Sequence, residues 1–422
     1  MTKLLTYITL PLVLLTAFAC SSDDTEPVKE PTEIDYATTP GRRTIIAYIT
    51  GDNNLSDSLS ADITEMIAGS QNVQADCRII VFADLNNKKP FIAHINNGKM
   101  TKVKEYDNDF YTTSPDSMLS IYQWIIDHYP SSEYATVIEG HGSGPLINKD
   151  TIPTNLVTMN AYGTDGAGEV SATSTSKWIN IPSMTTVFSK LKDHEGRKLN
   201  FAYIFFDCCC FQSVEIAYQL RHSAEYIIAP ISETPGEGAN YKTMLPIMCE
   251  EKEHVANSIV NTYATQCRLC ISAIKTDGLE ALCQATRNAL ETLKQQRPSP
   301  LTLERHNVIH YFKTQHVPVL HDMQHLMKTN LSEEEYARWL PYLKNITVTK
   351  HFPAINTNYN DLWITGIGIN FYLFRDNLTE ENFGGISMIA PSDAYTAKHS
   401  DINTTMMQLE WCKAVGWQNL GW

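Results

Sequence analysis

The sequence has few charged residues and no excess of positive charge. Only 19% of its 422 residues are charged, and 47 acidic residues against 33 lysines and arginines give a formal net charge of −14. A broad basic surface for nucleic acid is therefore not expected. With 43% hydrophobic and 10% aromatic residues, the chain can bury a large core, which excludes wholesale disorder.

The sequence also lacks the motifs of a metal enzyme. It contains no HExxH, and the CxxC pair of Cys267 and Cys270 is not followed by a second pair of ligands. Two histidine-rich stretches, 306–312 and 316–325, carry no convincing ligand set. We interpret them as helix surface and core, and we predict no metal site.

Ten cysteines are present, one at position 20 and nine further along the chain. Because nine is odd, complete pairing would leave at least one free thiol. Their spacing does not resemble a compact disulfide framework, so we interpret most of them as small buried hydrophobic residues. Three of them, Cys208, Cys209 and Cys210, are consecutive and follow a hydrophobic run. The question is which of these three, if any, performs chemistry.

The N-terminus has the pattern of an export signal. Lys3 precedes an apolar run that ends at Cys20 and is too short for a membrane-spanning helix. TAFAC resembles a bacterial lipoprotein signal, and CSSDD resembles the surface-export tag of Bacteroides-type lipoproteins. We therefore predict a signal peptide over 1–19, lipid attachment at Cys20, a flexible tether over 20–40 and an outer-membrane location. An ordinary cleaved secretion signal is the alternative.

Strand-like and helix-like segments alternate over about 200 residues after this tether. Runs typical of buried strands lie at 42–50, 76–85, 134–144, 199–207 and 224–230. The alternation predicts an α/β fold with a mostly parallel central sheet covered by helices on both faces. We assign the core to 41–245. The region 246–422 either completes this sheet or forms a separate module.

Two of the predicted strands end in residues suited to covalent catalysis. His141 follows the third strand between two glycines, and Cys209 follows the fourth strand directly before a predicted helix. Ligands of parallel sheets bind at such carboxyl ends. A cysteine is already partly thiolate near neutral pH, and a histidine pKa near 6.5 suits proton transfer. The residues alone allow either a catalytic pair or a structural histidine.

The order of these motifs resembles the clostripain family of cysteine peptidases, which belongs to the caspase-like clan. The resemblance is carried by YITGDNNL, EGHGSG, YGTDGAGE, FDCC followed by SVEIAYQL, and ISETPGEGANY. It covers 42–245 well and the C-terminal third loosely. It implies a caspase-like α/β/α sandwich with a C-terminal subdomain, and an endopeptidase that cleaves after arginine or lysine without a required cofactor.

The resemblance also implies roles for single residues. The family's motif of an aspartate, a small residue and the nucleophilic cysteine falls on Asp207, Cys208 and Cys209, which leaves the third cysteine to packing. His141 would transfer protons to and from the reacting groups. The backbone N–H groups of Gly142 and Cys209 would stabilise the oxyanion.

Acidic residues would recognise the basic side chain of the substrate. Asp207 and Glu237 are the candidates, with a structural carboxylate and an exposed loop charge as their respective alternatives. Relatives are often activated by self-cleavage, for which Lys149 and Lys177 are candidates. Some relatives respond to calcium; GDNN and TDGAGE could supply oxygen ligands, although neither has EF-hand spacing.

Two other functions stay open at this point. One is a catalytically silent relative that binds peptides or host proteins, although the presence of both His141 and Cys209 counts against it. The other is a thiol-dependent acyl or peptidyl transferase. For the peptidase, we expect peptide or protein substrates, membrane attachment through the lipid on Cys20, no nucleic-acid partner and a monomer.

Overall fold

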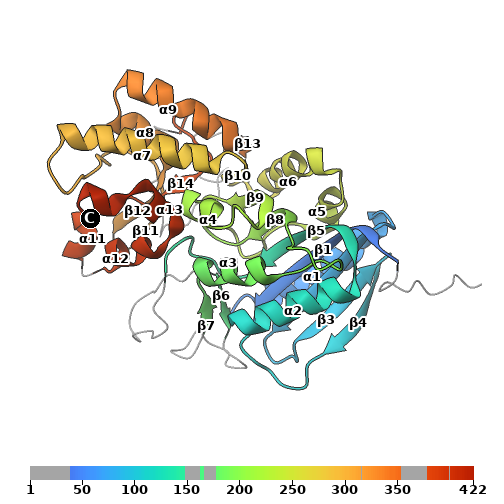
Figure 1. Ribbon diagram of the computed structural model, residues 1–422. Coiled ribbons are helices and arrows are strands. Elements are labelled where there is room, and N and C mark those ends of the chain that lie inside the picture. Colours follow the sequence, from blue (N-terminus) through green and yellow to red (C-terminus); the bar gives the residue numbers. More distant parts are fainter. Residues whose placement is uncertain (1–38, 148–161, 166–176, 315, 353–377, 399) are drawn as a thin grey trace, which may run out of the picture. The chain divides into compact units, whose positions relative to one another are not determined.

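The computed structural model describes residues 39–147, 162–165, 177–314, 316–352, 378–398 and 400–422. Within these residues a nine-stranded sheet has the order β13-β10-β9-β8-β5-β1-β2-β3-β4 (Figure 1). Its strands are β1 (Gly41–Gly51), β2 (Cys77–Leu85), β3 (Phe91–Asn96), β4 (Lys99–Glu105), β5 (Ser131–Glu139), β8 (Phe201–Asp207), β9 (Ala224–Pro230), β10 (Ile271–Lys275) and β13 (Thr347–His351). The five strands from β9 to β2 are parallel, and antiparallel strands flank them at both edges.

Helices cover both faces of this sheet (Figure 1). One face packs against α2 (Pro115–His128), α3 (Ile181–Lys190) and α4 (Val214–Gln219), and the other against α1 (Ser56–Gly69), α5 (Tyr241–Met248) and α6 (Lys252–Cys267). Successive side chains of β1 alternate between these two cores, with Ile46 and Tyr48 on one side and Ile45 and Ile49 on the other. The predicted α/β fold is thereby confirmed.

Local sequence signals explain several element boundaries. The β3–β4 hairpin turns at Asn97 and Gly98, which both have positive φ (46° and 74°), as a tight Asn-Gly turn requires. Helix α2 begins after Ser114, whose hydroxyl accepts the N–H of Ser117 (3.2 Å). Pro115 occupies the first helical turn, where its missing N–H has no cost.

The C-terminal region extends the main sheet and also forms a second one. It supplies β10 and β13, and a three-stranded antiparallel sheet joins β11 (His310–Thr314), β12 (Val317–Asp322) and β14 (Ser387–Met388). Its helices are α7 (Leu279–Gln296), α8 (Met323–Asn330), α9 (Glu333–Ile346), α11 (Asp393–Ala397), α12 (Ile402–Thr405) and α13 (Glu410–Val415). Residues 36–422 cluster as one compact unit. The strand-like run WITGIGINFYLF lies outside the described residues.

The helical interpretation of the two histidine-rich stretches is wrong in part. The last three residues of the first stretch belong to β11, most of the second stretch forms β12, and the final residues of the second begin α8. His310 and His321 are buried there, so the expectation that part of these stretches belongs to the core holds. A short strand that is covered on both faces shows no alternation of apolar and polar residues in its sequence. Here histidines are buried together with apolar side chains, so the strand pattern was not visible.

A fully buried arginine ties the start of β1 to the end of α5. Arg43 donates to Glu133 Oε2 through Nε (3.1 Å) and Nη2 (2.8 Å). Its Nη1 donates to the carbonyl oxygens of Met248 (3.0 Å) and Glu250 (2.6 Å). These contacts satisfy carbonyl groups at and just beyond the C-terminal end of α5, where the Met248 oxygen also accepts from the Tyr203 hydroxyl (2.8 Å).

A disulfide between Cys77 and Cys249 reinforces the same junction. It joins the first residue of β2 to the residue after α5, across a sequence separation of 172. These two cysteines depart from the expectation of buried hydrophobic thiols. The seven other cysteines among the described residues are free, and all of them except Cys209 are buried.

We expect loss of the disulfide to destabilise the folded chain without changing the fold. Replacing both cysteines (C77S with C249S) should lower the free energy of unfolding by about 2–4 kcal/mol, because the unfolded chain regains the freedom of a long loop. Chemical denaturation with and without reductant measures this. Reductant should bring the native chain to the value of the double variant and leave the variant unchanged; a native chain insensitive to reductant would contradict the bond.

Candidate active site

The register of two central strands places the candidate histidine and cysteine beside each other. Strands β5 and β8 pair in parallel, with Glu139 opposite Asp207. His141 and Cys209 each lie two residues beyond this pair, in the segments that leave the sheet at its carboxyl edge. Positions 68 residues apart in the sequence therefore reach one edge of the sheet, as the sequence motifs suggested.

Glycines allow the loop after β5 to approach the turn after β8 closely. A Cβ atom on Gly142 would lie 2.8 Å from the carbonyl oxygen of Cys209 and 2.9 Å from the ring of Phe211. A Cβ on Gly144, which has a φ of +68°, would lie 2.8 Å from the carbonyl oxygen of Cys210. Any larger residue would force the two segments apart, so these glycines are needed for the close approach.

Only the middle one of the three consecutive cysteines reaches the cavity. Cys208 and Cys210 are each 1% exposed, whereas Cys209 is partly exposed and lines the cavity. Cys210 adopts a positive φ of 63°, which turns the chain sharply after the strand. The Cys209 Sγ accepts the backbone N–H of Thr234 (3.3 Å) and lies 3.5 Å from the Thr234 hydroxyl. Burial raises the pKa of the Cys209 thiol, and the Thr234 contacts oppose this shift.

His141 lines the same cavity of about 190 Å³. Its Nε2 lies 2.8 Å from Oδ1 of Asn54, in the turn between β1 and α1. Burial lowers the pKa of His141. Because burial raises the pKa of the thiol and lowers that of the imidazole, the pair favours its neutral form. The structure records no direct hydrogen bond between these two described side chains, and such contacts often tighten only when substrate binds.

Three carboxylates share this cavity with the histidine and the cysteine. They are Asp62 from α1, Glu139 from the end of β5, and Asp207 from the end of β8. Each of them is buried. A small hollow lined by several acidic groups suits a single cationic side chain better than a larger ligand.

Asp207 has the structural contacts of one alternative and also lies at the cavity, as the other alternative requires. It lines the cavity, and it also accepts hydrogen bonds from the Ala239 N–H (2.8 Å) and from the hydroxyls of Tyr241 (2.9 Å) and Tyr263 (2.5 Å). Burial raises its pKa, while these three donors oppose the shift. The carboxylate therefore anchors the loop that precedes α5 as well as facing the cavity.

The sequence-based reasoning missed Asp62 and Glu139. Asp62 lies on the buried face of α1 together with Leu59 and Ile63, and an aspartate on an apolar helix face was a signal available in the sequence. Burial, followed by the charges of Glu139 and Asp207, raises the pKa of Asp62 to about 10. Burial also raises the pKa of Glu139 well above its usual range.

The other candidate residues lie in different places. Glu237 is exposed on the loop whose glycines line the cavity, and its charge contributes to the raised pKa of Asp62. Lys177 begins β7 (Lys177–Ile179), which pairs with β6 (Tyr162–Asp165). Lys149 and Cys20 lie outside the described residues.

Within the described ranges, no group of histidine, cysteine and acidic residues is arranged to hold a metal ion, and no helix has the length and apolarity needed to span a membrane.

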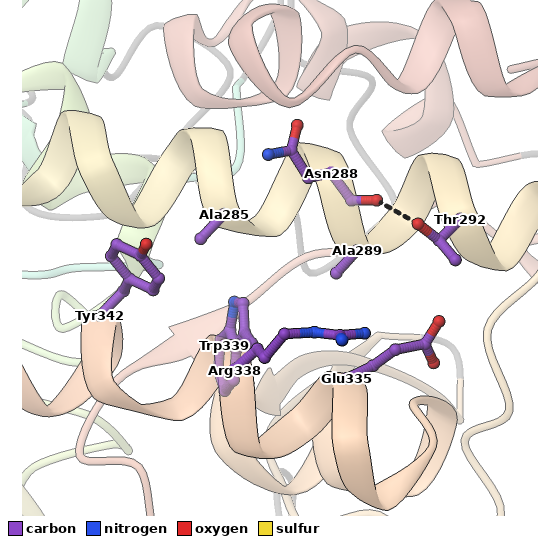
Figure 2. Close-up of a pocket in the computed structure, with 8 residues that line it drawn as sticks. All are labelled: Ala285, Asn288, Ala289, Thr292, Glu335, Arg338, Trp339 and Tyr342. Atoms are coloured by element: carbon purple, nitrogen blue, oxygen red, sulfur yellow. Dashed lines mark hydrogen bonds between the residues drawn. The ribbon is translucent and has the colours of Figure 1, made fainter.

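A second hollow, of about 240 Å³, lies between α7 and α9 (Figure 2). Ala285 and Ala289 form its α7 side, and Arg338, Trp339 and Tyr342 line it from α9. None of its lining residues is a cysteine or a histidine. It therefore offers neither the thiol nor the imidazole that the sequence motifs contain, and the cavity at the carboxyl edge of the main sheet is the candidate active site.

The parallel centre of the sheet thus brings a histidine and a cysteine, the residue types of thiol-dependent covalent catalysis, to adjacent strand ends. The chain belongs to the clostripain family: the model of this family matches residues 47–368, well over half of its length. Both the α/β fold and the resemblance to this family are thus confirmed. No curated protein matches the sequence.

Solved structures with the same fold cover nearly the whole chain. One is a secreted C11 cysteine protease from Bacteroides thetaiotaomicron in complex with an irreversible peptide inhibitor, with 24% identity, a TM-score of 0.69 and coverage of 90% of this chain and 100% of that one. Another is an inactive zymogen C11 protease from Parabacteroides distasonis, with 20% identity, a TM-score of 0.69 and coverage of 89% and 99%. At these identities the likeness concerns the fold.

We expect Asp62→Asn to stabilise the folded chain at neutral pH. The folded state holds the Asp62 proton up to about pH 10 and the unfolded state only to about 3.8, so stability falls as pH rises between these values. The variant removes this pH-dependent loss. Its free energy of unfolding should exceed that of the native chain by at most about 4 kcal/mol at pH 7, and this difference should disappear near pH 4. Denaturant unfolding at both pH values measures it.

The exposed Asp57 on the same helix provides the matched control. Asp57→Asn should show no comparable pH-dependent gain. A difference between Asp62→Asn and the native chain that is equal at pH 4 and pH 7 would show that the Asp62 carboxyl is not buried among like charges.

Proposed function

We propose that this chain is an exported cysteine endopeptidase that hydrolyses peptide bonds after arginine or lysine. Cys209 is the nucleophile and His141 transfers the protons. The observation that carries this proposal is a single cavity that contains the thiol, the imidazole and three carboxylates. Membership of the clostripain family supports the peptidase chemistry.

The proposed reaction follows from the two side chains. His141 takes the thiol proton while the sulfur attacks the scissile carbonyl carbon, and the same imidazole then gives a proton to the leaving amine as the C–N bond breaks. A water molecule releases the acyl group and restores the thiol. The N–H groups of Gly142 and Cys209 stabilise the oxyanion, and the loss of one such donor typically costs about 3–4 kcal/mol of barrier.

The basic preference is inferred from the cavity's charge. A guanidinium or ammonium group that enters it would lower the pKa of Asp62 and stabilise the charged carboxylates, which otherwise repel one another. Asp207 is held by three internal donors and faces the substrate as a fixed acceptor. Glu237, on the exposed loop whose glycines line the cavity, adds a further acidic group that acts on Asp62.

We further propose export through the N-terminal signal with lipid attachment at Cys20. The disulfide between Cys77 and Cys249 supports this, because such bonds persist in oxidising compartments outside the cytosol. Self-cleavage at Lys149 or Lys177 and activation by calcium are part of the same proposal. The reaction itself uses protein side chains and requires no cofactor.

We expect the mature protein to release the reporter group from short amides that end in arginine or lysine. Cys209→Ala and His141→Ala should each lower the rate by at least about 100-fold, because each removes a group that moves electrons or protons in the reaction. Cys210→Ala is the control, since this neighbouring thiol is buried. No turnover after trypsin nicking and calcium addition would favour the silent, peptide-binding alternative, and release only with an added amine would favour a transferase.

We also expect Asp62 to set the preference for a basic side chain. Asp62→Asn should lower the ratio of kcat/KM for arginine-ended over alanine-ended reporters by about 10- to 100-fold, the effect of one charge-assisted hydrogen bond. Asp57→Asn, an exposed change on the same helix, should leave the ratio unaltered. A ratio that stays within twofold in the Asp62 variant would remove Asp62 from the specificity site.

A further inference from the structure

We propose that Asn54 is a positioning residue for His141: its amide oxygen accepts the imidazole Nε2–H and leaves Nδ1 to exchange protons with Cys209 and the leaving amine. This inference rests on the proposed function, because it assigns the direction of proton transfer within the same site. It extends the histidine–cysteine pair by a third residue, contributed by the turn between β1 and α1.

The contact favours one tautomer of the imidazole. Asn54 Oδ1 lies 2.8 Å from His141 Nε2. A side-chain amide oxygen can only accept, so the ring must donate through Nε2. The neutral imidazole then has its lone pair on Nδ1. Because His141 and Cys209 line the same cavity, Nδ1 is the nitrogen left to serve the thiol.

The preceding asparagine holds the turn that presents Asn54. Asn53 is 1% exposed, and its side chain accepts the Leu55 N–H (2.8 Å) and donates to the Thr50 carbonyl oxygen (3.2 Å). Its own carbonyl oxygen accepts from Asn86 Nδ2 (2.7 Å). Asn54 itself is exposed and contacts the ring of His141. The backbone position of Asn54 is therefore set by its neighbours, and its side chain is available to the imidazole.

An amide suits this position better than a carboxylate would. Asp62, Glu139 and Asp207 already line the cavity with His141. A further carboxylate in direct contact would favour the imidazolium, whereas a general base must be neutral at the start of the reaction. A neutral acceptor orients the ring and fixes its tautomer without adding negative charge. Burial, which lowers the pKa of His141, acts in the same direction.

The proton inventory is balanced in this scheme. The thiol proton moves to Nδ1 as the sulfur–carbon bond forms, and it moves from Nδ1 to the leaving nitrogen as the carbon–nitrogen bond breaks. In the second half, Nδ1 takes a proton from water as the new carbon–oxygen bond forms and returns it to the sulfur when the thioester breaks. The hydrogen bond from Nε2 to Asn54 is retained throughout.

The test compares Asn54→Ala and Asn54→Asp with Asn72→Ala, an exposed asparagine in the short helix after α1. We expect Asn54→Ala to lower kcat by about 10- to 100-fold with KM changed less than threefold, because the ring loses its orientation while substrate contacts stay. Asn54→Asp keeps an acceptor and should restore part of kcat, with the acidic limb of the kcat/KM profile moved to higher pH. Asn72→Ala should behave like the native chain.

A second readout does not depend on activity. Nitrogen-15 NMR of histidine-labelled protein should show His141 as the Nε2–H tautomer in the native chain and a mixture of tautomers in Asn54→Ala. If no reporter is cleaved, the proposed function fails while this measurement still tests the contact. An Nδ1–H tautomer in the native chain, or a kcat for Asn54→Ala equal to that of Asn72→Ala, would overturn the role of Asn54.

Discussion

The parallel pairing of β5 with β8 is the constraint on which the candidate site depends. With Glu139 opposite Asp207, both strands end at the same level of the sheet, and the next residues of each segment meet at one edge. A shift of one residue would exchange the side chains that face the cavity and the core. The buried Ile204 and Phe206 on β8, with Ile138 on β5, lock this register, because a slip would remove them from their apolar contacts.

The same edge concentrates carboxyl groups that the fold must accommodate. Asp207 is stabilised by two tyrosine hydroxyls and a backbone N–H, whereas burial and its neighbours leave Asp62 protonated over a wide pH range. Residues that stabilise a fold alone are seldom arranged as several like charges around one hollow. Burying these carboxyl groups together lowers the stability of the fold, and a cationic group bound in the cavity would offset this loss.

Three segments that are distant in sequence converge on the imidazole and the thiol. The turn after β1 supplies Asn54, the glycine-rich loop after β5 supplies His141, and the turn after β8 supplies Cys209. The first of these turns is held by the buried Asn53, and Gly142 allows the other two to touch. The site is thus built on strand ends rather than on long loops.

The sequence by itself predicted the α/β class and the five parallel strands of the central sheet, and it singled out His141 and Cys209 at two of their ends, since apolar runs and glycine-flanked motifs are local signals. It did not determine the strand character of the histidine-rich stretches, the pairing of Cys77 with Cys249, or the presence of Asp62 in the cavity. These features depend on which surfaces meet after folding. Hydrophobic periodicity shows that a residue is buried, but only the tertiary packing decides what it is buried against.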